Sequence, residues 1–192
     1  MKKMFDLKFP SGFNPKTQKQ VGLFVAQLDD QLKDLEQQVK GMTVKQLEWQ
    51  LKPGMNTVGI LLAHLALTEL WWINFVGKGI EWKPEMRDAL MKITGFDDDG
   101  IPLPKDGQHI KILKGYTVEM YIKVLKNARR SIKKEIKKWN DRNLDQLCAY
   151  KTRKFSRRWI LYHLLEHFAS HLGQVLLLKH MMVDAGVLKK KK

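Results

Sequence analysis

Three histidines stand four residues apart in the segment HLLEHFASHLGQ, which covers residues 163–174. They are His163, His167 and His171. In an α-helix, four residues are just over one turn, so consecutive members of this series lie on nearly the same face, roughly 6 Å apart along the helix axis. Two imidazoles at this spacing can chelate one metal ion. His163 and His171 lie about 12 Å apart along the axis, so all three cannot bind the same ion.

The three histidines differ in the direction that each faces. We placed the core direction of the helix among its apolar residues, which are Leu161, Leu164, Phe168, Leu172 and Val175. With about 100° of rotation per residue, His171 lies about 70° from that direction, His167 about 110° and His163 about 150°. The pair His167 and His171 is therefore the better inward-facing chelate. His163 is expected to be exposed, and a position that supports the ligand histidines is the alternative for it. His180 lies half a rotation from His171 and is expected to take no part.

A chelating pair needs a third ligand, and the apolar segment NTVGILLAHLALTELWWINFVG, residues 56–77, contains one histidine, His64. Thr68 and Leu61 share its helical stripe. Glu69 lies about 140° around the helix from His64, so we expect it to be structural. Two interpretations stay open from the residues alone. One is a metal site, and the other is a histidine satisfied within the core, beside a pair that arises by chance.

Four long helices are predicted to position these residues, from apolar periodicity and from capping residues. The first helix covers residues 20–40 and ends at Gly41, and the second covers residues 56–77 with Asn56 as its cap. The third extends from Thr117 to Asn140, and the fourth begins at its cap Ser156 and ends at Gly186. Thr43 and Gln46 form a capping box for a short helical segment, residues 43–51. No strand pattern is convincing. The sequence therefore predicts an all-α fold, a four-helix bundle.

A segment of different character separates the second and third helices. Residues 78–115 contain three prolines, several glycines and the acidic turn GFDDDG. Such a composition indicates a long crossover, to which residues 85–93 (EMRDALMKI) can add a short helix. Two aromatic residues of this crossover, Trp82 and Phe96, are candidates for shaping a pocket at the end of the bundle.

The length of 192 residues suits a single domain, residues 1–192, with one sizeable core. Residues 1–15 and 189–192 are expected to be flexible. Cys148 is the one cysteine, which excludes an internal disulfide and a thiolate-rich zinc cluster and favours a reducing compartment. The start MKKMFDLKFP lacks the features of a secretory signal. We therefore expect a cytoplasmic location.

A membrane location is the alternative for the apolar second helix. Residues 58–76 are about long enough to span a bilayer. His64, Glu69 and Asn74 inside that stretch would be costly in lipid. A buried helix is therefore favoured, and no membrane partner is expected.

The formal charge of +15 raises the question of nucleic-acid binding, since clustered Lys and Arg attract phosphate groups. Much of the excess lies in KVLKNARRSIKKEIKK, residues 123–138, and in the tail of residues 189–192. In the first of these, an apolar helical stripe leaves most basic residues on the opposite side, as on a solvated face. No DNA-binding motif accompanies the charge. Nonspecific nucleic-acid binding at most is expected.

The segments VGILLAHLALTELWW (58–72) and WILYHLLEHFASHLGQ (159–174) together resemble the motifs of the DinB/YfiT-like superfamily of metalloenzymes. Carried over by position, the metal-ligand histidines of that family fall on His64, His167 and His171. The resemblance implies a four-helix bundle of up-down-down-up order, which requires a long connection between the second and third helices. Leu172 departs from the pattern, because many members have a basic residue before Gly-Gln.

The resemblance also implies a chemistry. Three neutral imidazoles on Zn²⁺ or Ni²⁺ leave at least one coordination position open, as in catalytic sites. The ion lowers the pKa of a bound water or thiol. Characterised members of the superfamily include transferases and isomerases that use small thiols such as bacillithiol or mycothiol. A small-molecule substrate and thiol-dependent S-transfer are thus implied for this chain, with metal-dependent hydrolysis as the nearest alternative.

Two further functional classes stay open. One is a basic nucleic-acid-binding module, and the other is a metal-stabilised helical bundle without catalytic activity. No residue is assigned as a general acid or base. Gln174 can hydrogen-bond a ligand imidazole or a substrate, and Thr68 can orient bound solvent. A homodimer is also compatible with the sequence.

Overall fold

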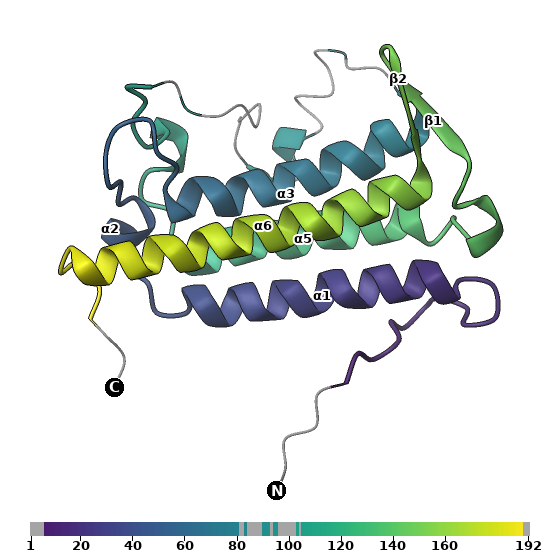
Figure 1. Ribbon diagram of the computed structural model, residues 1–192, viewed down its shortest axis with the longest axis horizontal. Helices are drawn as coiled ribbons and strands as arrows, with labels where there is room; N and C mark the ends of the chain where they lie inside the picture. Colours follow the sequence, from purple (N-terminus) through teal and green to yellow (C-terminus); the bar gives the residue numbers. More distant parts are fainter. Residues whose placement is uncertain are drawn as a thin grey trace, which may run out of the picture.

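Four long helices form the framework of the protein, and the computed structural model describes residues 6–80, 83, 90–92, 94–95, 103 and 105–189. The helices are α1 (Lys19–Val39), α3 (Val58–Asn74), α5 (Val118–Ile136) and α6 (Arg157–Asp184). Helices α1 and α6 run in one direction and α3 and α5 in the other (Figure 1). Helix α3 packs against both α5 and α6, and α1 also packs against these two helices. The prediction of a mainly helical fold is confirmed.

Short elements connect the long helices. They are α2 (Val44–Leu47), the 3-10 helices η1 (Val76–Lys78), η2 (Lys111–Leu113) and η3 (Asp141–Asn143), and the strands β1 (Leu147–Tyr150) and β2 (Arg153–Ser156). The two strands form an antiparallel hairpin in which Cys148 lies opposite Phe155. The all-α prediction is wrong in this respect. Each strand has four residues, which is too short for an alternating apolar pattern to be recognised.

Aromatic contacts attach the hairpin to the helices. The ring of Tyr150 lies 5.4 Å from that of Trp71, and the ring of Phe155 lies 5.1 Å from that of Trp72, both measured between centroids. A two-stranded hairpin is marginally stable on its own. These contacts with α3 therefore give the hairpin the packing that it needs.

The helix starts follow the expected capping chemistry with one correction. The capping box of Thr43 and Gln46 is present at α2. Ser156 caps α6, where its hydroxyl accepts a hydrogen bond from the Trp159 amide. The cap of α3 is Thr57 and not Asn56: the Thr57 hydroxyl accepts from the Ile60 amide at 3.1 Å. The Thr57 hydroxyl is also fully buried and lies 2.8 Å from Nδ1 of His109, a distant partner that the local sequence does not reveal.

The C-terminal part of the third predicted helix also differs. Helix α5 ends at Ile136, four residues before the predicted end at Asn140. The Asn140 side chain instead caps η3 by accepting hydrogen bonds from the amides of Arg142 and Asn143. A strong N-capping residue such as Asn thus starts a new helical turn at this position.

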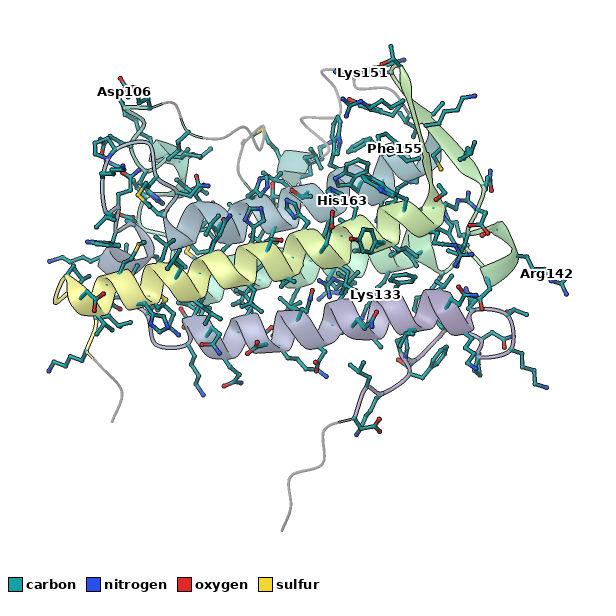
Figure 2. The ribbon with its side chains drawn as sticks, in the orientation of Figure 1. Asp106, Lys133, Arg142, Lys151, Phe155 and His163 are labelled. Carbon is teal, nitrogen blue, oxygen red and sulfur yellow. The ribbon has the colours of Figure 1, made fainter. Side chains whose placement is uncertain are left out.

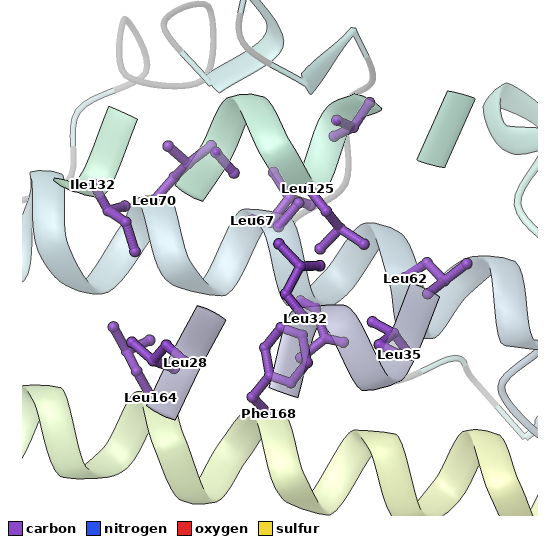
Figure 3. Packing of buried hydrophobic residues seen from close by; sticks show 14 of the residues in the cluster. Leu28, Leu32, Leu35, Leu62, Leu67, Leu70, Leu125, Ile132, Leu164 and Phe168 are labelled. Atoms are coloured by element: carbon purple, nitrogen blue, oxygen red, sulfur yellow. The ribbon is translucent and has the colours of Figure 1, made fainter. Parts of the chain in front are cut away.

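The core lies between the four long helices, each of which contributes leucine, isoleucine or phenylalanine side chains (Figure 3). Helix α3 is buried on nearly every side. The segment Val58–Lys78, α3 with η1, is long and apolar enough to cross a membrane by length and composition alone. Its position against α5 and α6 accounts for the same composition, because most of the segment is buried inside the fold.

Some predictions fall on residues outside the described ranges. Trp82 and Phe96 are among these, as is most of the short helix expected at 85–93, of which residues 90–92 are described and helical. Of the two ends expected to be flexible, residues 1–5 and 190–192 are not described. Within the remainder, Phe13 is buried in the core. The flexibility of both ends stays a prediction.

Candidate metal centre

The structure brings together the three histidines that the sequence singled out. Nε2 of His167 lies 3.1 Å from Nε2 of His64 on α3 and 3.1 Å from Nε2 of His171 on α6. One ring nitrogen from each of the three lies within 4.8 Å of the others. All three side chains are half-buried. Within the part of the chain that the structure describes, this trio is the one group of metal-binding side chains at such distances.

The packing of α3 against α6 produces this convergence. Residues 58–63 and 65–67 of α3 are all buried, and His64 between them is the position that opens toward α6. On α6, Leu164 and Phe168 are buried on either side of His167 and hold that face against the core. One turn separates His167 from His171, so both rings meet the single histidine of α3.

Burial keeps two of the imidazoles neutral. Desolvation, with a smaller contribution from His171, lowers the pKa of His64 to about 4. Desolvation also lowers the pKa of His167 to about 3, together with repulsion from the neighbouring histidines. A neutral imidazole is the form of histidine that binds a metal ion. Both residues are therefore in the ligand form at neutral pH.

A glutamine fixes the orientation of the third imidazole. Nδ1 of His171 lies 2.8 Å from Oε1 of Gln174, an acceptor, so Nδ1–H donates this hydrogen bond. The Nε2 atom of the neutral ring then carries the lone pair and faces His167. This arrangement, in which the far nitrogen of a histidine donates to an oxygen acceptor, is common at metal sites. On the other side of the cluster, Oγ1 of Thr68 lies 3.4 Å from Nε2 of His64.

Two of the three distances between ring nitrogens in the cluster suit a divalent ion. An ion bound about 2.0–2.1 Å from each of two nitrogens holds them about 2.8–3.4 Å apart for bond angles between octahedral and tetrahedral. The two Nε2 pairs at 3.1 Å lie within that interval. The donor set of three imidazoles suits Zn²⁺ or Ni²⁺ and brings no compensating negative charge. His64, His167 and His171 can therefore hold such an ion, with coordination positions to spare.

The structure corrects the expectation for His163. Its side chain is 21% exposed and not fully exposed. The ring stacks on Trp159 at 4.8 Å and meets Trp72 edge-on at 4.7 Å, and Nδ1 lies 3.0 Å from a carboxylate oxygen of Glu166. Figure 2 shows His163 and Phe155 near one another at the hairpin end of α6. A helical projection of α6 alone could not include Trp72, which reaches across from α3.

His180 lies away from the cluster. It lines a different cavity, formed with Gln38 and Lys40 at the opposite end of α6. The expectation that His180 takes no part in the histidine cluster is consistent with this position.

Glu69 points into a buried ion-pair network and not toward the histidines. Nε and Nη2 of Arg129 donate to its two carboxylate oxygens, the first at 3.0 Å, and Nη1 of Arg129 donates to Asp29 at 3.1 Å. Arg129 is 4% exposed, and its guanidinium lies 5.5 Å from the centre of the Phe168 ring. One side chain of α5 thus contacts α1, α3 and α6. The structural role expected for Glu69 agrees with this arrangement.

Sequence reasoning missed Arg129 although a signal was present. Arg129 stands four residues after Leu125 and three before Ile132, which places it on the apolar stripe of α5. A carboxylate in a buried helix such as α3 also requires a cationic partner. The combination of a buried Glu69 and a basic residue on a facing apolar stripe was sufficient to suggest the pair.

Comparisons with known proteins agree with this fold. No curated protein sequence matches the chain. Among solved structures, a crystal structure at 2.01 Å resolution of a DinB-like protein from Bacillus cereus ATCC 10987 superimposes with a TM-score of 0.51. The two sequences are 18% identical, and the match covers 93% of this chain and 99% of that chain, which establishes a shared fold. A sequence profile of the mycothiol-S-transferase family matches residues 23–182. This match spans most of the chain, which therefore belongs to the DinB-like mycothiol-S-transferase family.

Proposed function

We propose that the protein is a divalent-metal-dependent S-transferase that uses a low-molecular-weight thiol. In this proposal His64, His167 and His171 are the metal ligands, and the ion is Zn²⁺ or Ni²⁺. The observation that carries the proposal is the convergence of three imidazole nitrogens, with His167 Nε2 at 3.1 Å from each of the other two, in a member of the mycothiol-S-transferase family.

The chemistry follows from the charge of the ligand set. His64, His167 and His171 would hold a divalent ion without neutralising its charge, and such an ion would supply Lewis acidity that lowers the pKa of a thiol substrate toward neutral pH. In the overall reaction, a sulfur–carbon bond forms to an electrophilic carbon and the bond from that carbon to its leaving group breaks. The thiol proton leaves with the departing group or to solvent, so atoms and charge balance.

The residues of the chain have distinct parts in this scheme. Gln174 accepts a hydrogen bond from Nδ1–H of His171 and so orients that ring, and burial keeps the imidazoles of His64 and His167 neutral. The hydroxyl of Thr68, close to His64 Nε2, is placed to hydrogen-bond the thiol or a water molecule. We interpret the four long helices as one up-down-down-up bundle in which α3 and α6 hold the site. A reducing compartment such as the cytoplasm would keep a thiol cosubstrate reduced.

Metal-dependent hydrolysis is the second candidate, because Thr68 can orient a water molecule as readily as a thiol. The two reactions make opposite demands on the open coordination position. A transferase would need this position for the thiol, whereas a hydrolase would need it for a water molecule.

The test is a thiol titration of tag-free protein loaded with Co²⁺ in place of the native ion. Thiol binding should produce a sulfur-to-metal charge-transfer absorption band, together with proton release, because the thiolate is the ligand. His64→Ala should abolish the band. His180→Ala is the matched control, since His180 is an exposed histidine that lines a different cavity, and this variant should keep the band.

Three results would redirect the proposal. Turnover of an ester or amide without a thiol band would favour the hydrolase. A tightly held metal with neither activity would indicate a structural ion. Metal-free protein after purification in Zn²⁺ or Ni²⁺ would remove the metal site altogether.

A further inference from the structure

An apolar cavity adjoins the histidine cluster along the groove between α3 and α6. Its volume is about 280 Å³, and its apolar lining comes from Met55, Leu61, Leu177, Leu178 and Met181. Two uncharged polar residues, Asn56 and Gln174, complete the wall. No charged side chain is among the described residues that line this cavity.

The cavity and the histidine cluster share the same two helices and one residue. Leu61 stands three residues before His64 on α3, and Gln174 stands three residues after His171 on α6, so each wall begins about 4.5 Å along the helix from a candidate ligand. Gln174 belongs to both sites, because its Oε1 atom accepts the hydrogen bond from Nδ1 of His171. The cavity therefore begins within one helical turn of the candidate ligands on both helices.

The wall of the cavity is held in place before any ligand binds. The side-chain nitrogen of Gln50 donates to the Met55 carbonyl at 2.7 Å and to the Gly107 carbonyl at 3.1 Å. Leu61 is 1% exposed and Leu178 is 5% exposed, so both are fixed in the core. Leu177, by contrast, is 54% exposed and faces solvent at the mouth. Preformed apolar walls with few polar groups are typical of small-molecule sites.

We propose that this cavity is the subsite that holds a neutral, apolar group of the electrophile, next to the thiol at the histidine cluster. The proposal rests on the S-transferase function proposed above. A volume of about 280 Å³ suits one part of a ligand, since whole-ligand pockets are usually about 300–1,000 Å³. The lining offers no partner for a charge, so a charged group would lose its hydration without compensation. The substrate class is thus an electrophile that carries an alkyl or aryl substituent.

The first arm of the test measures binding without any reaction. Methionine methyl groups of the metal-loaded protein are labelled with ¹³C, and hexanol is the neutral apolar probe, with ethanol for comparison. Hexanol should shift the NMR signals of Met55 and Met181, which line the cavity, and leave that of Met120 unchanged. Met120 is a suitable internal control because it lies on α5 and is 43% exposed.

A substitution at the mouth locates the binding site. Leu177→Trp should fill the mouth and remove most of the hexanol-induced shifts. Leu23→Trp is the matched control, because Leu23 is 49% exposed on α1 and does not line the cavity. Because both leucines are exposed, neither substitution should destabilise the fold. The thermal unfolding temperature of each variant checks this.

The second arm measures transfer of a small thiol to propylene oxide and to hexene oxide. In this reaction sulfur attacks a ring carbon, the carbon–oxygen bond opens, and the thiol proton ends on the oxygen as a hydroxyl group. Each buried methylene group should raise kcat/KM about fourfold, so the longer epoxide should be favoured by at least about tenfold. Leu177→Trp should lose most of this preference, whereas Leu23→Trp should retain it.

The two arms separate failure of the subsite from failure of the S-transferase function. Shifts of Met55 and Met181 that Leu177→Trp removes, without epoxide consumption by any thiol, would support the subsite and count against S-transfer. Epoxide consumption that is indifferent to alkyl length, with no methyl shift, would overturn the subsite and leave S-transfer in place. Equal shifts at Met120 would also overturn it, because they would indicate nonspecific binding.

Discussion

At the scale of single residues, the histidines of α6 differ in their surroundings, so their replacement should have different effects. His171 supplies one of the two Nε2 contacts of His167 and is itself oriented by Gln174. His163 and His180 lie on the same helix but have other surroundings: aromatic rings for His163 and a different cavity for His180. The same side-chain type on one helix therefore has three different roles.

Replacement of His171 by Ala should lower the bound metal content sharply, because two ligands seldom retain a divalent ion. His180→Ala should leave the metal content unchanged. The measurement is metal analysis by mass spectrometry after dialysis of tag-free protein. Equal loss from the two variants would show that the ion is held elsewhere.

The lowered pKa values of His64 and His167 predict how the stability of the metal-free protein depends on pH. Both groups have folded-state pKa values, about 4 and about 3, below the ordinary histidine pKa of about 6.5, so the unfolded chain binds more protons than the folded protein once the pH falls below about 6.5. The free energy of unfolding should therefore be highest above about pH 6.5 and should decrease between pH 6.5 and 5. Urea unfolding at several pH values measures this dependence.

A variant with both residues replaced, His64→Gln with His167→Gln, provides the control for the pH dependence. Glutamine has no titrating group, so the dependence between pH 6.5 and 5 should become much weaker. A slope as steep as that of the original protein would assign the protons to other groups. Carboxylates with lowered pKa values, such as Glu135 and Asp145, bind protons at lower pH, so they contribute little to the change in stability between pH 6.5 and 5.

At the scale of the helices, Arg129 joins elements that are far apart in the sequence. It pairs with Asp29 of α1 and Glu69 of α3 and lies over Phe168 of α6, the residue that follows His167. A buried ion pair is weak support for stability as a whole, but loss of one partner leaves an uncompensated buried charge. The network thus fixes the relative positions of the helices that hold the site.

The variant Arg129→Met should lower the free energy of unfolding by about 3–5 kcal/mol, because the Glu69 carboxylate is left buried without its cation. The neighbouring change Arg130→Ala should cost less than about 0.5 kcal/mol, since Arg130 is exposed. Urea unfolding compares the two. The double change Arg129→Met with Glu69→Leu should recover part of the loss, and a further loss would instead indicate that packing around Phe168 is the larger effect.

At the scale of the whole molecule, basic residues outnumber acidic ones. The sequence has 35 Lys and Arg residues against 20 Asp and Glu residues. Two of the lysines on α5 form ion pairs with residues of α1: Lys126 with Glu36 and Lys133 with Asp29. The basic face of α5 is therefore partly neutralised by α1, which reduces its value as a phosphate-binding surface.

Nucleic-acid binding should accordingly be weak and without sequence preference. Its affinity should fall steeply between about 50 and 200 mM salt, because it depends on release of counterions. Fluorescence anisotropy with two unrelated oligonucleotides measures both properties. Removal of residues 189–192 should weaken the binding without a change in metal content, and tight binding that survives high salt would contradict this prediction.

The sequence by itself determined the long helices and the inward-facing direction of two histidines one turn apart. Apolar periodicity and capping residues are local properties, so they placed α1, α3, α5 and α6 to within a few residues. The inward direction of His167 and His171 followed from the rotation per residue of the same helix. His64 was a candidate from the residues as the one histidine of the second helix, and the resemblance to the DinB-like proteins supported that choice. Periodicity alone could not do so, because α3 is apolar on nearly every side and its pattern does not specify which face meets α6.

Only the tertiary structure decided the features that depend on contacts between distant segments. The rotation of α3 about its axis, which brings His64 to His167, results from packing of all its faces at once. The partial burial of His163 requires Trp72 from another helix, and the cap at Thr57 involves His109, which lies 52 residues away. The hairpin depends on aromatic residues of α3, and the partner of Glu69 comes from α5. Such contacts provide partners for buried polar and aromatic groups. Because these partners lie far away in the sequence, a local sequence pattern cannot identify them.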